Sequence, residues 1–143
     1  MLGIALAVTV VDQLTKLAVQ QDMVLHESIP VIPGFFHITY ILNRGAAFGI
    51  LENQQWFFLV IALVLFLLYG LFRKQLPANP WVHGGAGLLL GGALGNALDR
   101  TFRGAVTDFF DFRIWPVFNV ADIGIVVGVV LLLWYSWTHI SDK

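Results

Sequence analysis

The sequence predicts an all-α membrane protein with four transmembrane helices and a small antiparallel β-sheet outside the membrane, between the first and second helices. Hydrophobic residues make up 58% of the 143 residues and charged residues only 12%, whereas a soluble domain has about 25% charged residues. Most of the surface is therefore expected to face lipid. One integral membrane domain is expected over residues 1–143, with spans at residues 1–19, 56–72, 81–98 and 117–137 and the sheet within residues 20–55.

The first span starts with uninterrupted apolar sequence over residues 1–11. That stretch alone is too short, because a helix needs about 20 residues to cross a hydrocarbon core of about 30 Å. The helical pattern continues past Asp12 and Lys16, where Leu17 and Val19 are still apolar. We therefore expect one helix that carries Asp12 near its far end.

The region from residue 20 to residue 55 is rich in Pro and Gly and too polar to span a membrane. Within it, Phe36, Ile38, Tyr40 and Leu42 alternate with other residues, and this period of two is typical of a half-buried strand. Two segments are expected to pair with that strand, namely residues 31–32 and 46–51. Because unpaired strands are not viable in hydrocarbon, the sheet is expected at the interface or in water.

Glycines recur every four residues in the third span, at Gly87, Gly91 and Gly95, and again in the fourth span at Gly124 and Gly128. Residues four apart lie on one helix face, and small residues with this spacing let helix backbones approach closely in lipid. The two spans are therefore expected to pack tightly against neighbouring helices.

The orientation follows from the short connection after the second span, which carries Arg73 and Lys74 and no acidic residue. Positively charged short loops stay in the cytoplasm. Four spans then put both termini in the cytoplasm as well. The opposite ends of the helices, with most of the acidic residues, are expected at the outer face.

Ionisable and amide side chains are unusually dense between residues 91 and 122. Asn96 and Arg100 are four apart on one helix face, and Asn119 and Asp122 are three apart at the start of the last span. The connection between these spans must fold back, so at least one of its two central acids is expected to approach Asp122. Those acids are Asp108 and Asp111. An ionisable residue at a membrane boundary marks a candidate functional site.

Two carboxylates held close in a low dielectric share a proton. Such a pair can activate water with one carboxylate and polarise a substrate carbonyl with the other, which is peptide hydrolysis without a metal or a covalent intermediate. The chain has no Cys, its serines lie outside the polar cluster, and it lacks the H-E-x-x-H pattern of metalloproteases. No metal or cofactor is expected.

Simpler interpretations apply to several of these residues. Asp99 and Arg100 can form an ion pair at a helix end, and Asp111 can be a solvated loop acid. Caps or polar contacts between helices would account for Asp12, Asn43, Asn96 and Asn119. From the residues alone, the choice between Asp108 and Asp111 stays open.

Other classes of function remain possible for the same carboxylates. A small transporter or proton-conducting protein is the main alternative, although the sequence shows no internal repeat. A lipid-binding or assembly protein without enzymatic activity is the second. A net charge of -1 gives no basic face for nucleic acid.

Five motifs in this order resemble those of the bacterial lipoprotein signal peptidase (signal peptidase II) family. They are DQLTK at 12–16, NRGAAF at 43–48, GGALGN at 91–96 followed by Asp99 and Arg100, VTDF at 106–109, and FNVAD at 118–122. Together they extend over nearly the whole chain.

The resemblance implies a monomeric intramembrane aspartyl peptidase of the bacterial inner membrane, with its site near the periplasmic face. It would remove signal peptides from diacylglyceryl-modified prolipoproteins by cutting before the lipidated cysteine, and globomycin would inhibit it. Asp108 and Asp122 would be catalytic. The residues that orient them and hold substrate would be Asp12, Asn43, Asn96, Arg100 and Asn119. Residues 20–55 would form a periplasmic β-cradle and residues 103–115 a periplasmic helix.

Overall fold

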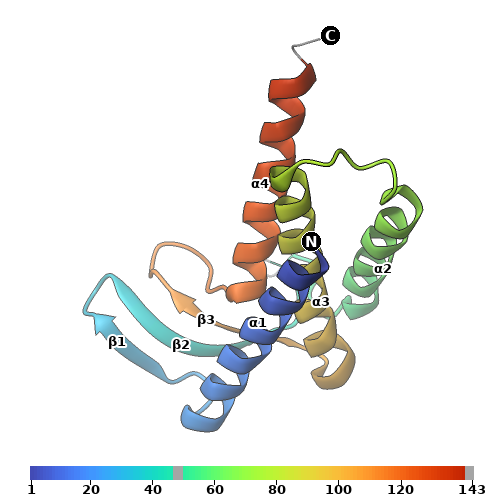
Figure 1. Ribbon diagram of the computed structural model, residues 1–143. Helices are drawn as coiled ribbons and strands as arrows, with labels where there is room; N and C mark the ends of the chain where they lie inside the picture. Colours follow the sequence, from blue (N-terminus) through green and yellow to red (C-terminus); the bar gives the residue numbers. More distant parts are fainter. Residues whose placement is uncertain (47–49, 141–143) are drawn as a thin grey trace.

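The computed structural model describes residues 1–46 and 50–140, and it contains four helices and three strands over these residues (Figure 1). Their order along the chain is α1 (Leu2–Asp22), β1 (Ser28–Ile32), β2 (Phe36–Asn43), α2 (Gln55–Phe72), α3 (Pro80–Arg103), β3 (Val106–Asp111) and α4 (Val120–Ile140). The four predicted helices are confirmed. The third extends to Arg103 instead of residue 98, and the fourth begins at Val120 instead of residue 117.

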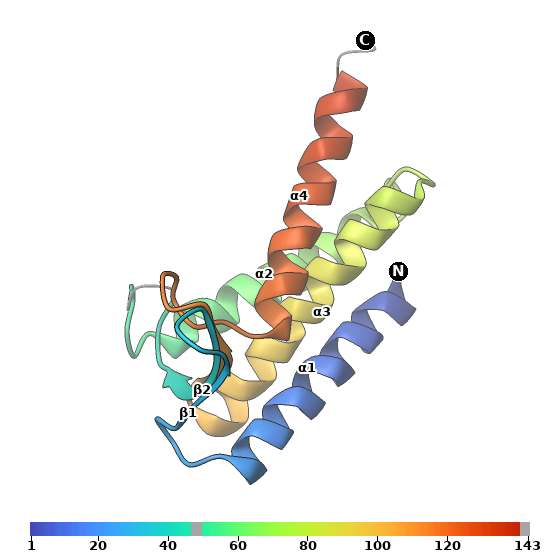
Figure 2. The ribbon, with the colours of Figure 1, turned by 90° about the vertical axis from the view of Figure 1, so that its left-hand side faces the viewer.

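The helices run in alternating directions, so that the N-terminus, the α2–α3 connection and the last turns of α4 lie toward one end of the molecule. The sheet lies at the opposite end, beside the C-terminal part of α1 and the start of α4 (Figures 1 and 2). This arrangement gathers the connections that carry most of the acidic residues at one end.

The sheet has the order β1-β2-β3, and both pairs of neighbouring strands are antiparallel. The predicted pairing of residues 31–32 with the strand at 36–42 is confirmed, since Ile32 opposes Phe36. The other predicted partner, residues 46–51, is wrong where it is described, because Ala46 and residues 50–51 form bends and turns. Residues 47–49 lie outside the described residues. The third strand is β3, which pairs with β2 from Val106 to Asp111.

The strand β3 corrects two expectations. The sheet is not confined to the segment between the first two helices, and residues 103–115 contain a strand and not the periplasmic helix that the resemblance implied. Gly104 ends α3 in the left-handed conformation, with a φ of 71°, which glycine adopts without steric cost. The following β-branched and aromatic residues, among them Val106, Thr107 and Phe109, favour an extended strand.

Helix α3 has clear local signals at both ends. The side chain of Asn79 caps its start by accepting a hydrogen bond of 2.9 Å from the backbone N–H of Trp81. Pro80 occupies the first helical position, where its missing N–H costs nothing. At the other end, the N–H of Gly104 bonds to the carbonyl of Arg100. These signals determine where α3 starts and where it ends.

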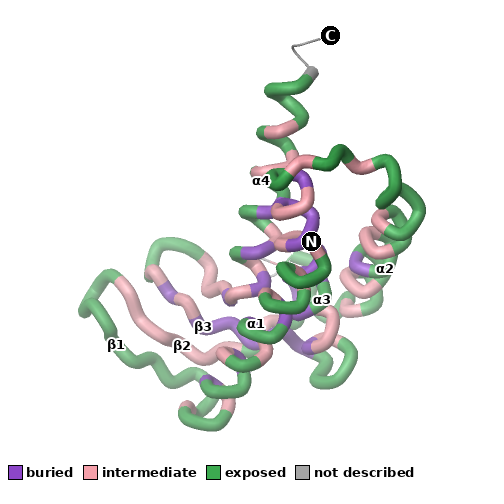
Figure 3. Tube along the Cα trace, viewed as in Figure 1, coloured by how far each residue is buried: buried purple, intermediate pink, exposed green. Residues whose placement is uncertain are grey.

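Among the described residues, three helices are long and apolar enough to cross a membrane, namely α1, α2 and α4. The protein is therefore a multi-pass membrane protein. The third predicted span, α3, is not among the three, and it is the helix most enclosed by protein (Figure 3). A helix surrounded by other helices needs fewer apolar side chains than one that faces lipid.

The predicted close packing is confirmed at Gly91, and Gly92, which was not among the predicted glycines, packs as closely on another face of α3. A Cβ on Gly91 would overlap Ala5 of α1, and a Cβ on Gly92 would overlap the backbone of Ala121 in α4. Both are contacts with backbone atoms, which cannot move aside without displacing a whole helix. Glycine at these positions therefore brings α1 and α4 close to α3, and with them the side chains that those helices carry.

Candidate active site

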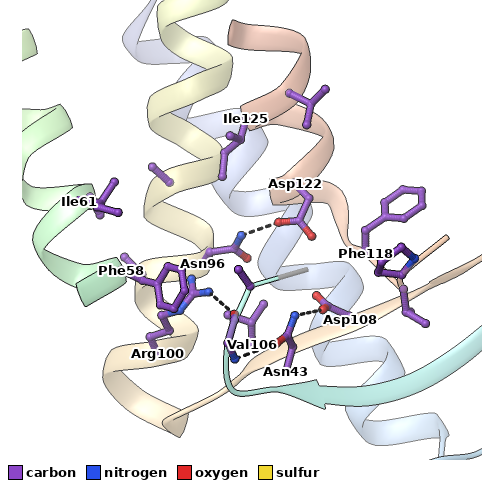
Figure 4. A pocket seen from close by; sticks show the side chains of 18 of the residues that line it. Asn43, Phe58, Ile61, Asn96, Arg100, Val106, Asp108, Phe118, Asp122 and Ile125 are labelled. Carbon is purple, nitrogen blue, oxygen red and sulfur yellow. Dashed lines mark hydrogen bonds between the residues drawn. The ribbon is translucent and has the colours of Figure 1, made fainter. Parts of the chain in front are cut away.

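Asp108 and Asp122, the dyad, line one cavity of about 390 Å³ at the sheet end of the helices. In Figure 4 their carboxylates face the same space, with Asn43, Asn96 and Arg100 around it. The cavity is bounded by α2, α3, β3 and the first turns of α4. Five of the seven site residues predicted from the sequence therefore line one cavity.

Asp122 is positioned by the start of α4. Asn119 precedes the helix, and its side-chain oxygen accepts a hydrogen bond of 2.9 Å from the N–H of Asp122. The carboxylate of Asp122 in turn accepts one of 3.2 Å from the N–H of Asn119, which is a reciprocal capping box. Because the helix begins at Val120, Asp122 lies in its first turn. The expected span over residues 117–137 would have placed Asp122 five residues after its start, whereas the helix places it two residues after Val120.

Asp108 is positioned by β3 and is almost fully buried, with 1% of its surface exposed. Its Oδ1 accepts a hydrogen bond of 2.6 Å from Nδ2 of Asn119, and its Oδ2 accepts one of 3.0 Å from Nδ2 of Asn43. Burial, and secondly the negative charge of Asp122, raise the pKa of Asp108 to about 7. The site therefore retains a proton at a pH where exposed carboxylates have lost theirs.

The three asparagines around the dyad are themselves held. Asn96 donates a hydrogen bond of 2.8 Å to Oδ1 of Asp122, and Asn119 forms hydrogen bonds with both aspartates. The side-chain oxygen of Asn43 accepts 2.9 Å from the N–H of Gly45, which turns its Nδ2 toward Asp108. Both carboxylates are thus oriented by donors whose own positions are determined.

Arg100 belongs to the cavity and not to an ion pair with Asp99. Its Nη2 donates 3.2 Å to the carbonyl of Gly45, and its guanidinium lies 4.3 Å from the ring centroid of Phe58. Its Nε is buried and has no hydrogen-bond partner among the described residues. The helix-end ion pair expected for Asp99 and Arg100 is wrong, because neighbouring helical residues point about 100° apart.

Asp99 faces α1 instead. Its side chain has 0% exposure and bonds to Lys16 at 3.2 Å and to Arg103 at 2.8 Å. Asp12 is also outside the cavity lining. It bonds to Lys16 at 2.8 Å and accepts 2.8 Å from the N–H of Ala121 at the start of α4. Lys16 was not predicted as a site residue, and its signal was its spacing of four residues after Asp12 on one helix face.

Asp111 is not the solvated loop acid expected from the sequence. It ends β3 with 6% exposure, and it accepts hydrogen bonds of 2.7 Å from Thr39 and 2.8 Å from the N–H of Arg113. Although burial opposes ionisation, the hydrogen bonds from Thr39 and Arg113 lower the pKa of Asp111. It does not line the cavity. Residues an odd number apart in a strand face opposite sides, which separates Asp111 from Asp108.

Comparison with known proteins agrees with this geometry. The chain matches the signal peptidase (SPase) II family over residues 4–138. It is 46% identical to a lipoprotein signal peptidase of Halothermothrix orenii, over 94% of this chain and 92% of that protein. It is 50% identical to one of Pelotomaculum thermopropionicum, over 95% of this chain and 90% of that protein.

Two solved structures, both described as bacterial membrane enzymes determined by the in meso method, have the same fold. One superposes with a TM-score of 0.91 and 36% identity, over 98% of this chain and 88% of the other. The second gives a TM-score of 0.82 and 39% identity, over 92% of this chain and 88% of the other. From these matches, the chain belongs to the signal peptidase II family, and it is a peptidase.

Proposed function

We propose that this protein is an aspartic endopeptidase that removes signal peptides from diacylglyceryl-modified prolipoproteins, cutting before the lipidated cysteine. The observation that carries this proposal is the shared cavity of Asp108 and Asp122, which reach it from β3 and α4 and are both bonded by Asn119. The names of the relatives, lipoprotein signal peptidases, support the class of substrate.

In the proposed reaction, the dyad holds one proton and a water molecule lies between its carboxylates. The ionised carboxylate takes a proton from the water as the water oxygen attacks the scissile carbonyl carbon. The protonated carboxylate gives its proton to the carbonyl oxygen, which forms a neutral diol. When the diol collapses, the C–N bond breaks, a proton passes from the dyad to the leaving amine, and one diol hydroxyl returns its proton to the dyad, which restores the one-proton state. The raised pKa of Asp108 favours this one-proton state near neutral pH.

The remaining predicted site residues take supporting roles in this proposal. Asn43, Asn96 and Asn119 hold the carboxylates in one orientation, which lowers the entropic cost of reaching the reactive geometry. Arg100 lines the cavity with a buried Nε that has no described partner. We propose that Arg100 donates a hydrogen bond to a backbone carbonyl of the substrate. Asp12 acts from behind α4, through Ala121.

We also propose that α3 crosses the membrane in addition to α1, α2 and α4, and that α1 and α4 shield it from lipid. The α2–α3 connection carries Arg73 and Lys74 and lies at the end opposite to the sheet. With that connection in the cytoplasm, the dyad faces the periplasmic side of the bacterial inner membrane. A lipid-modified substrate would then enter the cavity from the outer leaflet.

The transporter alternative is less well supported by the distribution of acids. In the described parts of the helices, α2 carries no Asp or Glu, and α4 carries only Asp122 in its first turn. A proton path needs ionisable groups along the membrane, whereas these acids gather at one end. Proton flux through liposomes containing the purified protein, measured with a pH-sensitive dye, tests this alternative.

The test of the peptidase is cleavage of a diacylglyceryl-modified prolipoprotein by the purified protein, with and without globomycin. Asp108→Asn and Asp122→Asn are each expected to lower kcat at least about 100-fold, the usual size of a general acid–base contribution. Both variants should still fold and bind globomycin. Asp111→Asn is the matched control from the same strand and should keep most activity. Retained turnover in both dyad variants would refute the assignment. A protein whose function is unchanged by Asp→Glu at both positions would instead be a binding protein, because a dyad needs the shorter side chain.

A further inference from the structure

A buried ionic cluster lies behind the dyad, and the proposed reaction does not use it. This cluster, which we call the clamp, consists of Asp12 and Lys16 of α1 and Asp99 of α3. The Nζ of Lys16 lies 2.8 Å from Asp12 and 3.2 Å from Asp99, and all three side chains have 0% exposure. Lys16 therefore connects two carboxylates on two different helices.

Each carboxylate of the clamp also holds one backbone N–H next to a dyad aspartate. Asp12 accepts 2.8 Å from the N–H of Ala121, the residue before Asp122. Asp99 accepts 3.0 Å from the N–H of Thr107, the residue before Asp108. The two dyad aspartates, which come from separate elements, are thus both tied through one neighbour to the same ammonium group.

Lys16 makes a third contact that reaches the dyad through a side chain. Its Nζ donates 3.0 Å to Oδ1 of Asn96, and Nδ2 of Asn119 lies 3.2 Å from the same oxygen. With its oxygen occupied by two donors, the amide of Asn96 presents Nδ2 to Asp122. Lys16 and Asn119 together therefore determine which way this amide is turned.

Stability alone does not account for such a cluster. Burying charges has a large desolvation cost, and apolar residues of similar volume are often as stabilising as a buried ion pair. What the clamp supplies is directional contact between α1, α3, β3 and α4, which packing of apolar groups defines less sharply. Short charge-assisted hydrogen bonds hold their partners in a narrow range of distance and angle.

We propose that Lys16 is a positioning residue that sets the separation of Asp108 and Asp122. It does so through Asp12 and Ala121 on one side and through Asp99 and Thr107 on the other. This inference rests on the proposed role of the dyad. In the proposed reaction, Lys16 does not touch the reacting atoms.

The variant that tests this removes the bridge without leaving a buried charge alone. Lys16→Met by itself would leave the buried Asp12 without its ion-pair partner and Asp99 with Arg103 alone, and such a loss can prevent folding. In the triple variant Asp12→Asn, Lys16→Met and Asp99→Asn, the asparagine oxygens can still accept from the N–H groups of Ala121 and Thr107. Methionine has a similar length to lysine. Arg103, which loses its partner, is 36% exposed and reaches water.

We expect the triple variant to fold and to keep its KM within about threefold, while kcat falls about 10- to 100-fold. A misplacement of the order of 1 Å in an active site has effects of this size. A kcat within about twofold of the wild-type value in a folded sample would overturn the proposal.

The pH profile distinguishes positioning from a general loss of structure. Repulsion between the dyad carboxylates spreads the two apparent pKa values that bound a bell-shaped profile. If the aspartates move apart, the repulsion weakens and the bell becomes narrower. Removing the charges of the clamp shifts both limbs in one direction and leaves their spacing unchanged. The charged groups around Lys16 on its own and neighbouring elements are Asp12, Asp99, Arg103, Asp108 and Asp122. A fall in kcat with an unchanged spacing would therefore also overturn the proposal.

Thr9→Val is the matched control. Thr9 is a buried polar residue of α1 that bonds across the same α1–α3 interface, at 3.0 Å to the carbonyl of Gly91, without contact to the clamp. Its loss should lower the melting temperature and leave the bell spacing as it is. The two proposals fail separately. Active Asp108→Asn and Asp122→Asn variants would refute the dyad, whereas inactive ones beside an unaffected triple variant would refute only the role of Lys16.

Discussion

Asn119 makes two contacts that can be separated by substitution. Its oxygen caps α4 through the N–H of Asp122, and its Nδ2 donates 2.6 Å to Asp108. Serine at this position keeps a capping oxygen and removes the amide donor. Alanine removes both. Comparing Asn119→Ser with Asn119→Ala therefore separates the effect of losing the cap of α4 from the effect of losing the hydrogen bond to Asp108.

The magnitudes follow from the nature of each contact. A hydrogen bond to a charged group contributes about 1.5–3 kcal/mol, so Asn119→Ser should lower kcat about 10- to 100-fold. Loss of an N-cap costs about 1 kcal/mol, so Asn119→Ala should in addition lower the melting temperature below that of Asn119→Ser. Serine is a good N-cap, and Asn119→Ser should remain close to the wild type in stability.

The pH dependence has a definite sign. The hydrogen bond from Asn119 stabilises the ionised form of Asp108 and lowers its pKa. Without it the pKa of Asp108 rises above about 7, and the site keeps its proton to higher pH. The alkaline limb of the kcat/KM profile should therefore move to higher pH in both variants.

The assay is cleavage of a fluorescent diacylglyceryl-modified peptide between pH 5 and pH 10, at about the same detergent and salt throughout. Asn79→Ser is the matched control, because Asn79 caps α3 with a 2.9 Å bond to Trp81 and has no contact with the dyad. An alkaline limb that stays in place or moves to lower pH in the Asn119 variants would refute the reasoning.

Two further predictions concern stability. Burial and Asp122 raise the pKa of Asp108 in the folded protein, so the folded state is more stable at low pH and loses that stability as the pH rises through about 7. Asp108→Asn should therefore raise the melting temperature at pH 8 more than at pH 4. An equal change at both pH values would contradict a buried, protonated Asp108. Gly92→Ala should lower the melting temperature markedly, because its Cβ would overlap the backbone of Ala121, whereas Gly84→Ala meets no atom within 4 Å and should be tolerated; equal behaviour of the two variants in thermal unfolding would refute the role of Gly92 in packing.

Much of the fold could be predicted because its signals are local. The apolar stretches indicated four helices, the glycine spacing indicated close contacts at Gly91 and Gly128, and the alternation at residues 36–42 indicated a strand. Each of these patterns depends on residues within a few turns or strand positions of one another. Their boundaries were less well predicted, since the first residue of α4 depends on the cap at Asn119.

The third strand could not be predicted in this way. Its partner β2 lies more than 60 residues earlier in the chain, since Asn43 opposes Val106. A six-residue segment in a connection carries little pattern of its own, and its pairing is decided by the edge of β2 that the folded helices leave open. The resemblance to the signal peptidase II family selected Asp108, and the strand explains that selection by turning Asp111 away from the cavity.

By itself, the sequence determined a membrane protein of four helices with a concentration of acids and amides at one end, because hydrophobicity and helical period are properties of neighbouring residues. Only the tertiary structure decided that Asp99 and Arg100 face different partners, and that Lys16 joins the backbones beside both dyad aspartates. Distances between side chains on separate elements depend on strand register, helix start and helix rotation. Those are set by contacts between distant parts of the chain, which no local pattern contains.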